Sequence, residues 1–193
     1  HSILGGATPS LGFVVKGLYD YYQITKKVSV IKLMENASIF IDNELEKHID
    51  HSGVSFSYTP IKKDICYNAS LLAAEALAKT SSLSKKYNYY NLVKKAVDFV
   101  IHKQYDDGRW NYSIDLSLKK EDKQIDFHQG YILESIYEIK KVLKIDNDNW
   151  DKSISLGLDF YLKKQFNKNG RSLWRYPKKF PIDIHNQAQG IIT

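Results

Sequence analysis

The sequence has 193 residues, of which 43% are hydrophobic and 26% are charged. These proportions are typical of one globular domain that buries a sizeable core. Lysine and arginine outnumber aspartate and glutamate by 28 to 22, which gives a formal net charge of +6. The lysines stand singly or in pairs and form no basic arm or tract, so the composition does not favour a nucleic-acid partner.

Cysteine content and apolar runs narrow the class of protein further. Cys66 is the only cysteine, which excludes an internal disulfide and gives no sign of an oxidising compartment. No apolar run reaches the roughly 18 residues of a membrane span. The chain begins without Met and ends on HNQAQGIIT, which is typical of the start of a helix. We therefore expect a fragment of a cytoplasmic protein.

Helical periodicity dominates the chain, and strand-like alternation is confined to short pieces such as GVSFSYTP. In chain order, the pattern predicts helices over 10–25, 28–46, 67–80, 87–104, 128–143 and 150–165, and a last one that begins near His185. The sequence therefore predicts an all-α fold in a single domain, 1–193.

These helices belong to a repeat of about 60 residues. The segments VKKAVDFVIHKQYDDGRWNYSID and QIDFHQGYILESIYEI together match the later ISLGLDFYLKKQFNKNGRSLWRYPKKFPIDIHNQAQGI. An earlier, more degenerate copy runs from ASIFIDNELEKHIDHSG to YNASLLAAEAL. Turn glycines recur 55 and 62 residues apart, at Gly53, Gly108 and Gly170. Acids recur 62 and 57 residues apart, at Asp64, Asp126 and Asp183.

Each repeat pairs a helix rich in lysine with a more apolar helix such as NASLLAAEALA. A helix that is apolar on nearly all sides must be buried, whereas one with a charged stripe must face water. The sequence therefore predicts an α/α toroid with an inner and an outer layer of helices. Because about three and a half hairpins are fewer than the five or six of a closed ring, we expect a homo-oligomer or missing residues to complete it.

Two segments carry a resemblance to known helical toroids. Segment 95–110, KAVDFVIHKQYDDGRW, resembles the QW repeat of squalene cyclases and related toroids, and segment 160–174, FYLKKQFNKNGRSLW, is a looser second copy. The pieces FSYTP, YNASLLAAEAL, DDGRWNY, DFHQGYILESI and PIDIHNQAQGI together resemble a family of bacterial proteins from polysaccharide-biosynthesis clusters. Members are sometimes named delta-aminolevulinic acid dehydratase, but this strand-poor sequence does not support that name, because the true enzyme is an α/β barrel.

The corner after each outer helix has a mechanical interpretation. Gln104 can bond the free carbonyls at the helix end, Gly108 can supply the left-handed residue that ends the helix, and Trp110 can cover the corner. In the alternative interpretation, the aromatic residues of the corners form the rim of a sugar-binding mouth. Those residues are Trp110, Tyr112, Trp174 and Tyr176.

The repeated acids also have a structural interpretation. Asp126 stands three residues before Gln129, and Asp183 three before Asn186, which is the pattern of a helix N-cap whose third following residue bonds back. Capping does not explain why His128 and His185 stand two residues after these acids.

Inner helices of a toroid all run the same way, so their N-termini gather at one end of the central cavity. Carboxylates and imidazoles there can act as general acids and bases, and aromatic side chains can stack on sugars. The candidate catalytic residues are Asp64, Asp126, His128, Asp183 and His185. The candidate substrate-binding residues are Tyr58, Tyr67, Asn68, Trp110, Tyr112, Gln129, Tyr131, Trp174, Tyr176 and Gln187.

This pattern favours a protein of polysaccharide biosynthesis that acts on a saccharide as a lyase, epimerase or hydrolase, without a cofactor. The non-catalytic alternative is a glycan-binding or scaffold module in which the acids serve only as caps. The chain contains no Asp-x-Asp-Asp motif of the kind that squalene cyclases use, and no Gly-rich phosphate loop.

A further alternative concerns zinc. Asp64, Cys66 and the distant His128 resemble the zinc ligands in the β subunits of protein prenyltransferases, which share the toroid. One carboxylate, one thiolate and one imidazole leave a fourth position open, as catalytic zinc requires. The competing interpretation of Cys66 is a small buried hydrophobic residue.

Overall fold

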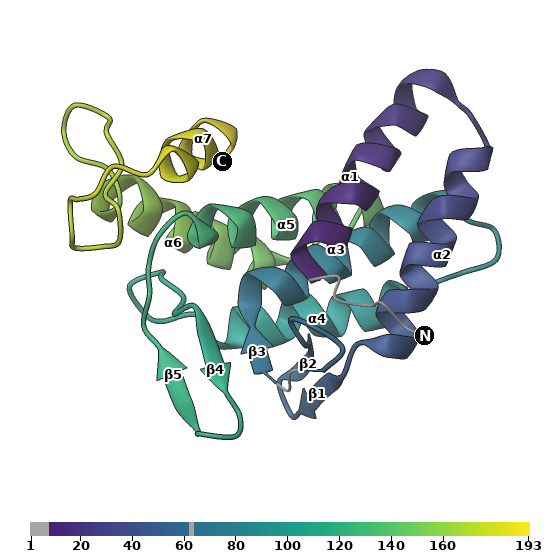
Figure 1. Ribbon diagram of the computed structural model, residues 1–193, viewed down its shortest axis with the longest axis horizontal. Helices are drawn as coiled ribbons and strands as arrows, with labels where there is room; N and C mark the ends of the chain where they lie inside the picture. Colours follow the sequence, from purple (N-terminus) through teal and green to yellow (C-terminus); the bar gives the residue numbers. More distant parts are fainter. Residues whose placement is uncertain (1–7, 62–63) are drawn as a thin grey trace.

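The computed structural model describes residues 8–61 and 64–193, and these are mostly helical (Figure 1). The helices are α1 (Thr8–Thr25), α2 (Ser29–Glu44), α3 (Tyr67–Leu83), α4 (Tyr90–His102), α5 (His128–Leu143), α6 (Asp148–Lys164) and α7 (Ile184–Ile192). The strands are β1 (Lys47–Asp50), β2 (Gly53–Phe56), β3 (Asp64–Cys66), β4 (Ser113–Asp115) and β5 (Lys120–Asp122). The predicted helices are confirmed, with ends that differ by at most three residues. None of the described helices combines the length and hydropathy needed to cross a membrane.

The helices form two layers. In the inner layer α3 packs between α1 and α5, and α7 packs against α5 (Figure 1). In the outer layer α2 covers α1 and α3, α4 covers α3, and α6 covers α5. Each inner helix alternates along the chain with an outer one, so the inner helices share one direction. The predicted α/α toroid is thus confirmed as an incomplete ring of helical hairpins.

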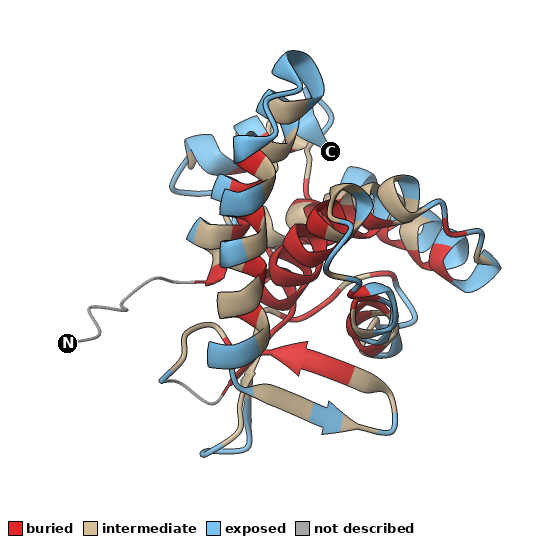
Figure 2. Cartoon of the chain, turned by 90° about the vertical axis from the view of Figure 1, so that its right-hand side faces the viewer, coloured by how far each residue is buried: buried red, intermediate tan, exposed pale blue. Residues whose placement is uncertain are grey.

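Helix α3 is the centre of the core. Every residue from Tyr67 to Thr80 is buried, and burial is concentrated in this central helix (Figure 2). Many of these buried residues are alanine or serine, whose small side chains let neighbouring helices approach closely. The prediction that NASLLAAEALA is surrounded on all sides is therefore confirmed.

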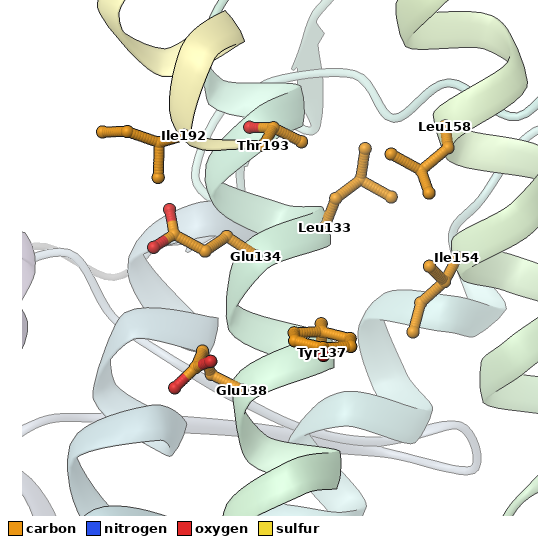
Figure 3. A pocket seen from close by; sticks show the side chains of 8 residues that line it. All are labelled: Leu133, Glu134, Tyr137, Glu138, Ile154, Leu158, Ile192 and Thr193. Carbon is orange, nitrogen blue, oxygen red and sulfur yellow. The ribbon is translucent and has the colours of Figure 1, made fainter.

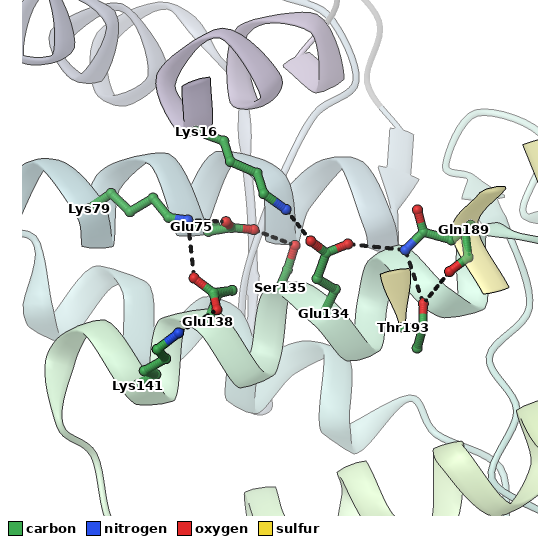
Figure 4. Close-up of polar contacts among 9 residues, drawn as sticks. All are labelled: Lys16, Glu75, Lys79, Glu134, Ser135, Glu138, Lys141, Gln189 and Thr193. Atoms are coloured by element: carbon green, nitrogen blue, oxygen red, sulfur yellow. Dashed lines mark hydrogen bonds and ion pairs between the residues drawn. The ribbon is translucent and has the colours of Figure 1, made fainter. Parts of the chain in front are cut away.

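Two groups of polar side chains, one buried and one partly buried, connect the inner helices (Figure 4). The ammonium of Lys79 lies 2.7 Å from Glu75 and 3.3 Å from Glu138, and the Ser135 hydroxyl donates to Glu75. Burial alone would lower the pKa of Lys79, but the attraction of Glu75 and Glu138 outweighs it and raises that pKa. Since the charges are paired, α3 and α5 pack without an isolated buried ion.

The second polar group lies beside the first and joins three helices (Figure 4). Glu134 of α5 accepts from Lys16 of α1 and from the amide of Gln189 in α7. Side chains of α1, α5 and α7 therefore meet at this position.

The short strands of the described residues lie along one side of the molecule, near the N-termini of α3 and α5 (Figure 1). Strands β1 and β2 form a hairpin, and β3, β4 and β5 form an antiparallel sheet in which Ile65 stands opposite Ile114. The piece GVSFSYTP correctly indicated β2. The other strands were missed because three or four residues give little periodicity and the partners β3 and β4 are far apart in the chain.

Trp110 and Gln104 hold the corner after α4. The Trp110 side chain is fully buried, and its indole N–H donates to the carbonyl of Val100 at 2.8 Å. The Gln104 amide donates to the carbonyls of Gly108 and Ser153, both at 3.0 Å, and Ser153 donates back to Gln104. Gln104 thus connects the corner to α6 instead of bonding the end of its own helix.

We predict that Gly108→Ala destabilises the fold more than Gly170→Ala. Both glycines have positive φ, at 94° and 80°, which costs an L-residue about 1–2 kcal/mol. A Cβ at Gly108 would also lie 2.2 Å from the carbonyl oxygen of Leu156, whereas a Cβ at Gly170 meets nothing within 4 Å. Overpacking should add about 1–3 kcal/mol at Gly108 alone. Urea unfolding measures both losses, and equal losses would contradict the contact with α6.

Candidate functional site

A buried carboxylate and a histidine meet at the start of α5. Oδ1 of Asp126 accepts the backbone N–H of His128 at 3.1 Å and also lies 2.5 Å from Nδ1 of its ring. One oxygen therefore both caps the helix and fixes the imidazole. The Asp126 side chain is 3% exposed and that of His128 is 17% exposed. Because Nδ1 is occupied, Nε2 is the nitrogen left to meet a ligand.

The other oxygen of Asp126 faces Gln124 and Arg175. The Gln124 amide donates to Oδ2, and Nε of Arg175 lies 3.9 Å from the same atom. Burial alone would raise the pKa of Asp126, but the hydrogen bonds and charge of His128, together with the bond from Gln124, lower it below its usual 3.8. Asp126 is thus ionised at neutral pH and acts as an acceptor, with no proton to donate.

Aromatic rings surround the imidazole. The ring centroid of His128 lies 4.2 Å from that of Phe127, 4.6 Å from that of Tyr112 and 6.0 Å from that of Tyr131. Phe13 of α1 contacts Tyr131 at 5.4 Å. Burial and the hydrogen bond with Cys66 raise the pKa of Tyr112, so its hydroxyl stays protonated. Partly exposed rings of this kind can stack on the apolar faces of a sugar.

A second copy of the same pair starts α7. Oδ1 of Asp183 accepts the backbone N–H of His185 at 2.9 Å and lies 3.0 Å from Nδ1 of its ring. The His185 ring lies 5.6 Å from Phe127, near-parallel to it, on a side chain that is 69% exposed. Phe127 therefore contacts both histidines.

The prediction that the third residue after each acid bonds back to it is wrong. Oε1 of Gln129 accepts the backbone N–H of Trp110 at 2.8 Å, and its amide donates to the carbonyl of Trp110 at 2.7 Å. In the next repeat, the amide of Asn186 donates to the carbonyl of Trp174 at 3.1 Å. These side chains fasten the inner helix to the corner before it.

Several predicted substrate-binding residues are structural. A rim that includes Trp110 is wrong, because the indole is fully buried in the core. Three more of these residues are buried with little surface for a ligand: Tyr67, Asn68 and Gln129. Asp64 is also buried, and its Oδ1 accepts the backbone N–H of Tyr58 at 2.9 Å. It therefore holds the segment before β3 and offers no exposed acid.

In the corner between α6 and α7, the residues predicted to bind substrate are partly accessible. Trp174 is half-buried beneath the guanidinium of Arg175, and Tyr176 packs on Phe160 with centroids 5.6 Å apart. Gln187 donates to the hydroxyl of Ser172. The sequence prediction missed Gln124, Phe127 and Arg175. Phe127 and Arg175 each stand beside a repeated motif residue, and Gln124 stands two residues before Asp126; this nearness in the sequence was the available signal.

The zinc ligands suggested by the sequence do not come together. The Cys66 thiol is buried and donates to Oδ1 of Asn68 at 3.1 Å. Across residues 8–61 and 64–193, no group of three His, Cys, Asp or Glu side chains is placed to hold a metal ion. Cys66 therefore behaves as the small buried residue of the competing interpretation.

A cavity of about 310 Å³ lies further along α5 (Figure 3). Its wall is mostly apolar, with Leu133 and Tyr137 from α5, Ile154 and Leu158 from α6, and Ile192 from α7. Neither Asp-x-His pair lines this cavity. The pairs lie instead at the N-terminal ends of α5 and α7.

The fold is shared with several carbohydrate enzymes of known structure. The chain matches cellobiose 2-epimerase from Spirochaeta thermophila (TM-score 0.72, 9% identity), covering 98% of this chain and 52% of that one. It matches a glycosyl hydrolase of family 88 from Bacteroides vulgatus (TM-score 0.69, 14% identity), covering 95% and 59%. It also matches a polysaccharide lyase (TM-score 0.68, 13% identity), covering 95% and 58%.

These likenesses show the fold alone, because the identities are low. The chain spans about half the length of each of these proteins. No family model and no curated protein sequence matches it.

We predict that Asp126→Asn removes an acid-dependent part of the stability. Because the folded-state pKa of Asp126 is lowered, its ionised form stabilises the fold above pH 3.8, and this contribution is lost as the pH falls from 3.8 through the folded-state value. Asn caps a helix about as well as Asp. The free energy of unfolding should therefore differ most between wild type and variant at neutral pH, and the difference should shrink below about pH 4.

Chemical unfolding between pH 3 and 7 measures this difference. Asp183→Asn is the matched control, because Asp183 forms the same two contacts with its own histidine at a more exposed site. A loss for Asp126→Asn that is the same at every pH would contradict the role of its ionised form.

Proposed function

We propose that the protein acts on a saccharide and that His128 transfers a proton to or from it. The observation that carries this proposal is the arrangement of the His128 ring: Nδ1 is held by the ionised Asp126, and the ring lies among partly exposed aromatic residues. A carboxylate on Nδ1 fixes the tautomer and stabilises the imidazolium that forms when Nε2 takes a proton. Tyr112, Phe127 and Tyr131 would contact the sugar.

Within the three reaction types that the sequence suggested, this geometry favours an epimerase or a lyase. Hydrolysis of a glycosidic bond normally uses two carboxyl groups that face the bond from opposite sides. Asp126 is buried behind His128 and already engaged by His128 and Gln124. The accessible group is the imidazole, which suits removal of a proton from a sugar carbon.

His185 is the second proton-transferring group of this proposal. It repeats the contacts of His128 with its own acid, Asp183, and its ring also contacts Phe127. Cellobiose 2-epimerase and the polysaccharide lyase share the fold, which agrees with a saccharide substrate but does not identify the reaction. The resemblance to proteins of polysaccharide-biosynthesis clusters supports the same substrate class.

The second candidate is a glycan-binding module without turnover. It is favoured by the fact that both acids bond a helix N-terminus, which is sufficient reason for their presence. In this case His128 and the aromatic rings would bind a sugar without removing a proton from it.

We predict that His128→Ala lowers the rate of proton transfer roughly 100- to 10,000-fold. The protein is incubated in D₂O with reducing disaccharides and with uronate oligosaccharides. NMR then follows deuterium entering sugar C–H positions, and absorbance follows unsaturated products. His51→Ala is the matched control, because His51 is exposed at the β1–β2 turn and contacts His102.

Three outcomes separate the candidates. Exchange that is lost in His128→Ala and kept in His51→Ala supports proton transfer by His128. Exchange that is unchanged in His128→Ala would contradict proton transfer by His128. Sugar binding without exchange or product formation in the wild type favours the glycan-binding candidate.

A further inference from the structure

We propose that Arg175 binds a carboxylate of the saccharide, so that the substrate is an acidic, uronate-type sugar. This inference rests on the proposed function, because it places the sugar beside His128. It adds the substrate class and a residue that determines specificity.

Arg175 lies in the corner between α6 and α7, next to the Asp126–His128 pair. Its guanidinium carbon is 4.7 Å from the centroid of the Trp174 ring, and its side chain is 44% exposed. Stacking on an indole limits the orientations of a guanidinium and leaves its edge free for hydrogen bonds. The group is therefore positioned and accessible.

Contacts within the protein occupy only some of the hydrogen-bond donors of this guanidinium. Its nearest carboxylate is Asp126, 3.9 Å away through Nε, which is longer than a hydrogen bond. The Asp126 oxygens already accept from His128 and Gln124. Within the described part of the chain, the Arg175 side chain has Asp126 as its ion-pair partner and Trp174 as its ring partner. Donors on its outer edge remain for a ligand.

The two carboxylate oxygens of Asp126 connect Arg175 with His128, the residue proposed to transfer the proton. Oδ1 holds His128 and Oδ2 faces Arg175, so imidazole and guanidinium flank one carboxylate. An anion on the outer edge of Arg175 would lie next to the imidazole. A guanidinium offers two parallel N–H donors, which match a carboxylate better than the separate hydroxyls of a neutral sugar.

This position also suits the proposed proton transfer. When His128 takes the proton from the carbon bonded to the carboxylate, the C–H electron pair moves into that carboxylate and forms an enediolate. The guanidinium stabilises the added negative charge. Return of a proton to the carbon restores the carboxylate, so the step needs no other reactant.

The test compares the binding of two sugars that differ only in charge. The probes are trigalacturonate and its carboxyl-reduced, neutral form, titrated by calorimetry against the whole 193-residue chain. We predict that the wild type binds trigalacturonate at least about 10-fold more tightly, which corresponds to about 1.4 kcal/mol. Arg175→Gln should abolish this preference, and Arg175→Lys should keep only part of it.

Arg109→Gln is the matched control. Arg109 also stacks on an aromatic ring, Tyr105, at 4.3 Å, but its carboxylate partner is Asp107. The preference for trigalacturonate should therefore be unchanged in this variant. Circular dichroism of each variant shows whether the fold is intact.

The outcomes are distinct from those of the proton-transfer test. Equal or undetectable binding of the two sugars by the wild type, or a preference that persists in Arg175→Gln, overturns the inference. Tighter binding of a sulfated trigalactoside than of trigalacturonate overturns it in favour of a sulfate ester. A preference that Arg175→Gln abolishes supports it, even if His128→Ala shows that no proton transfer occurs. If deuterium exchange occurs on neutral sugars and the wild type shows no preference for trigalacturonate, the proposed function stands and the inference about Arg175 fails.

Discussion

The placement of His128 depends on the pair of hydrogen bonds between Gln129 and the backbone of Trp110. Trp110 cannot shift, because its indole is fully buried and bonded to the carbonyl of Val100 at the end of α4. Gln129 therefore fixes the first turn of α5 relative to the outer helix, and the adjacent His128 is fixed with it. The orientation of a surface imidazole is thus determined by a core residue eighteen positions earlier in the chain.

Asp126 combines two roles that are usually separate. As a cap, it satisfies a free N–H at the start of α5; as a partner of Nδ1, it orients the ring whose proton chemistry is proposed. Both roles require an ionised or strongly accepting oxygen, and the hydrogen bonds that lower its pKa supply this condition despite burial. A structural role for the acid therefore does not argue against a catalytic role for the histidine it holds.

The repeat explains how much of the molecule was predictable from sequence. Periodicity located the helices. The recurrence of Gly, Trp and Asp-x-His located the corners that precede α5 and α7. Side-chain partners were less predictable. The bonds of Gln129 and Asn186 join residues that are distant in the sequence, and the burial of Trp110 depends on packing against Gly157 in α6. The role of Arg175 had no periodic signal, because it depends on which side of a folded corner faces the acid.

The same motif gives different environments in successive repeats, and the neighbours explain the difference. His128 starts α5, which has inner helices on both sides, and its side chain is 17% exposed; His185 starts α7, and its side chain is 69% exposed. Gln104 shows the same dependence, since it bonds Ser153 of the following outer helix, whereas the buried amide nitrogen of its counterpart Gln165 has no partner among the described residues. The side chains at a corner therefore find all their partners only where the following repeat is present. The histidine of the Asp-x-His pair is largely shielded from solvent only where both neighbours are present, and this is why the proposal for proton transfer rests first on His128 and only second on His185.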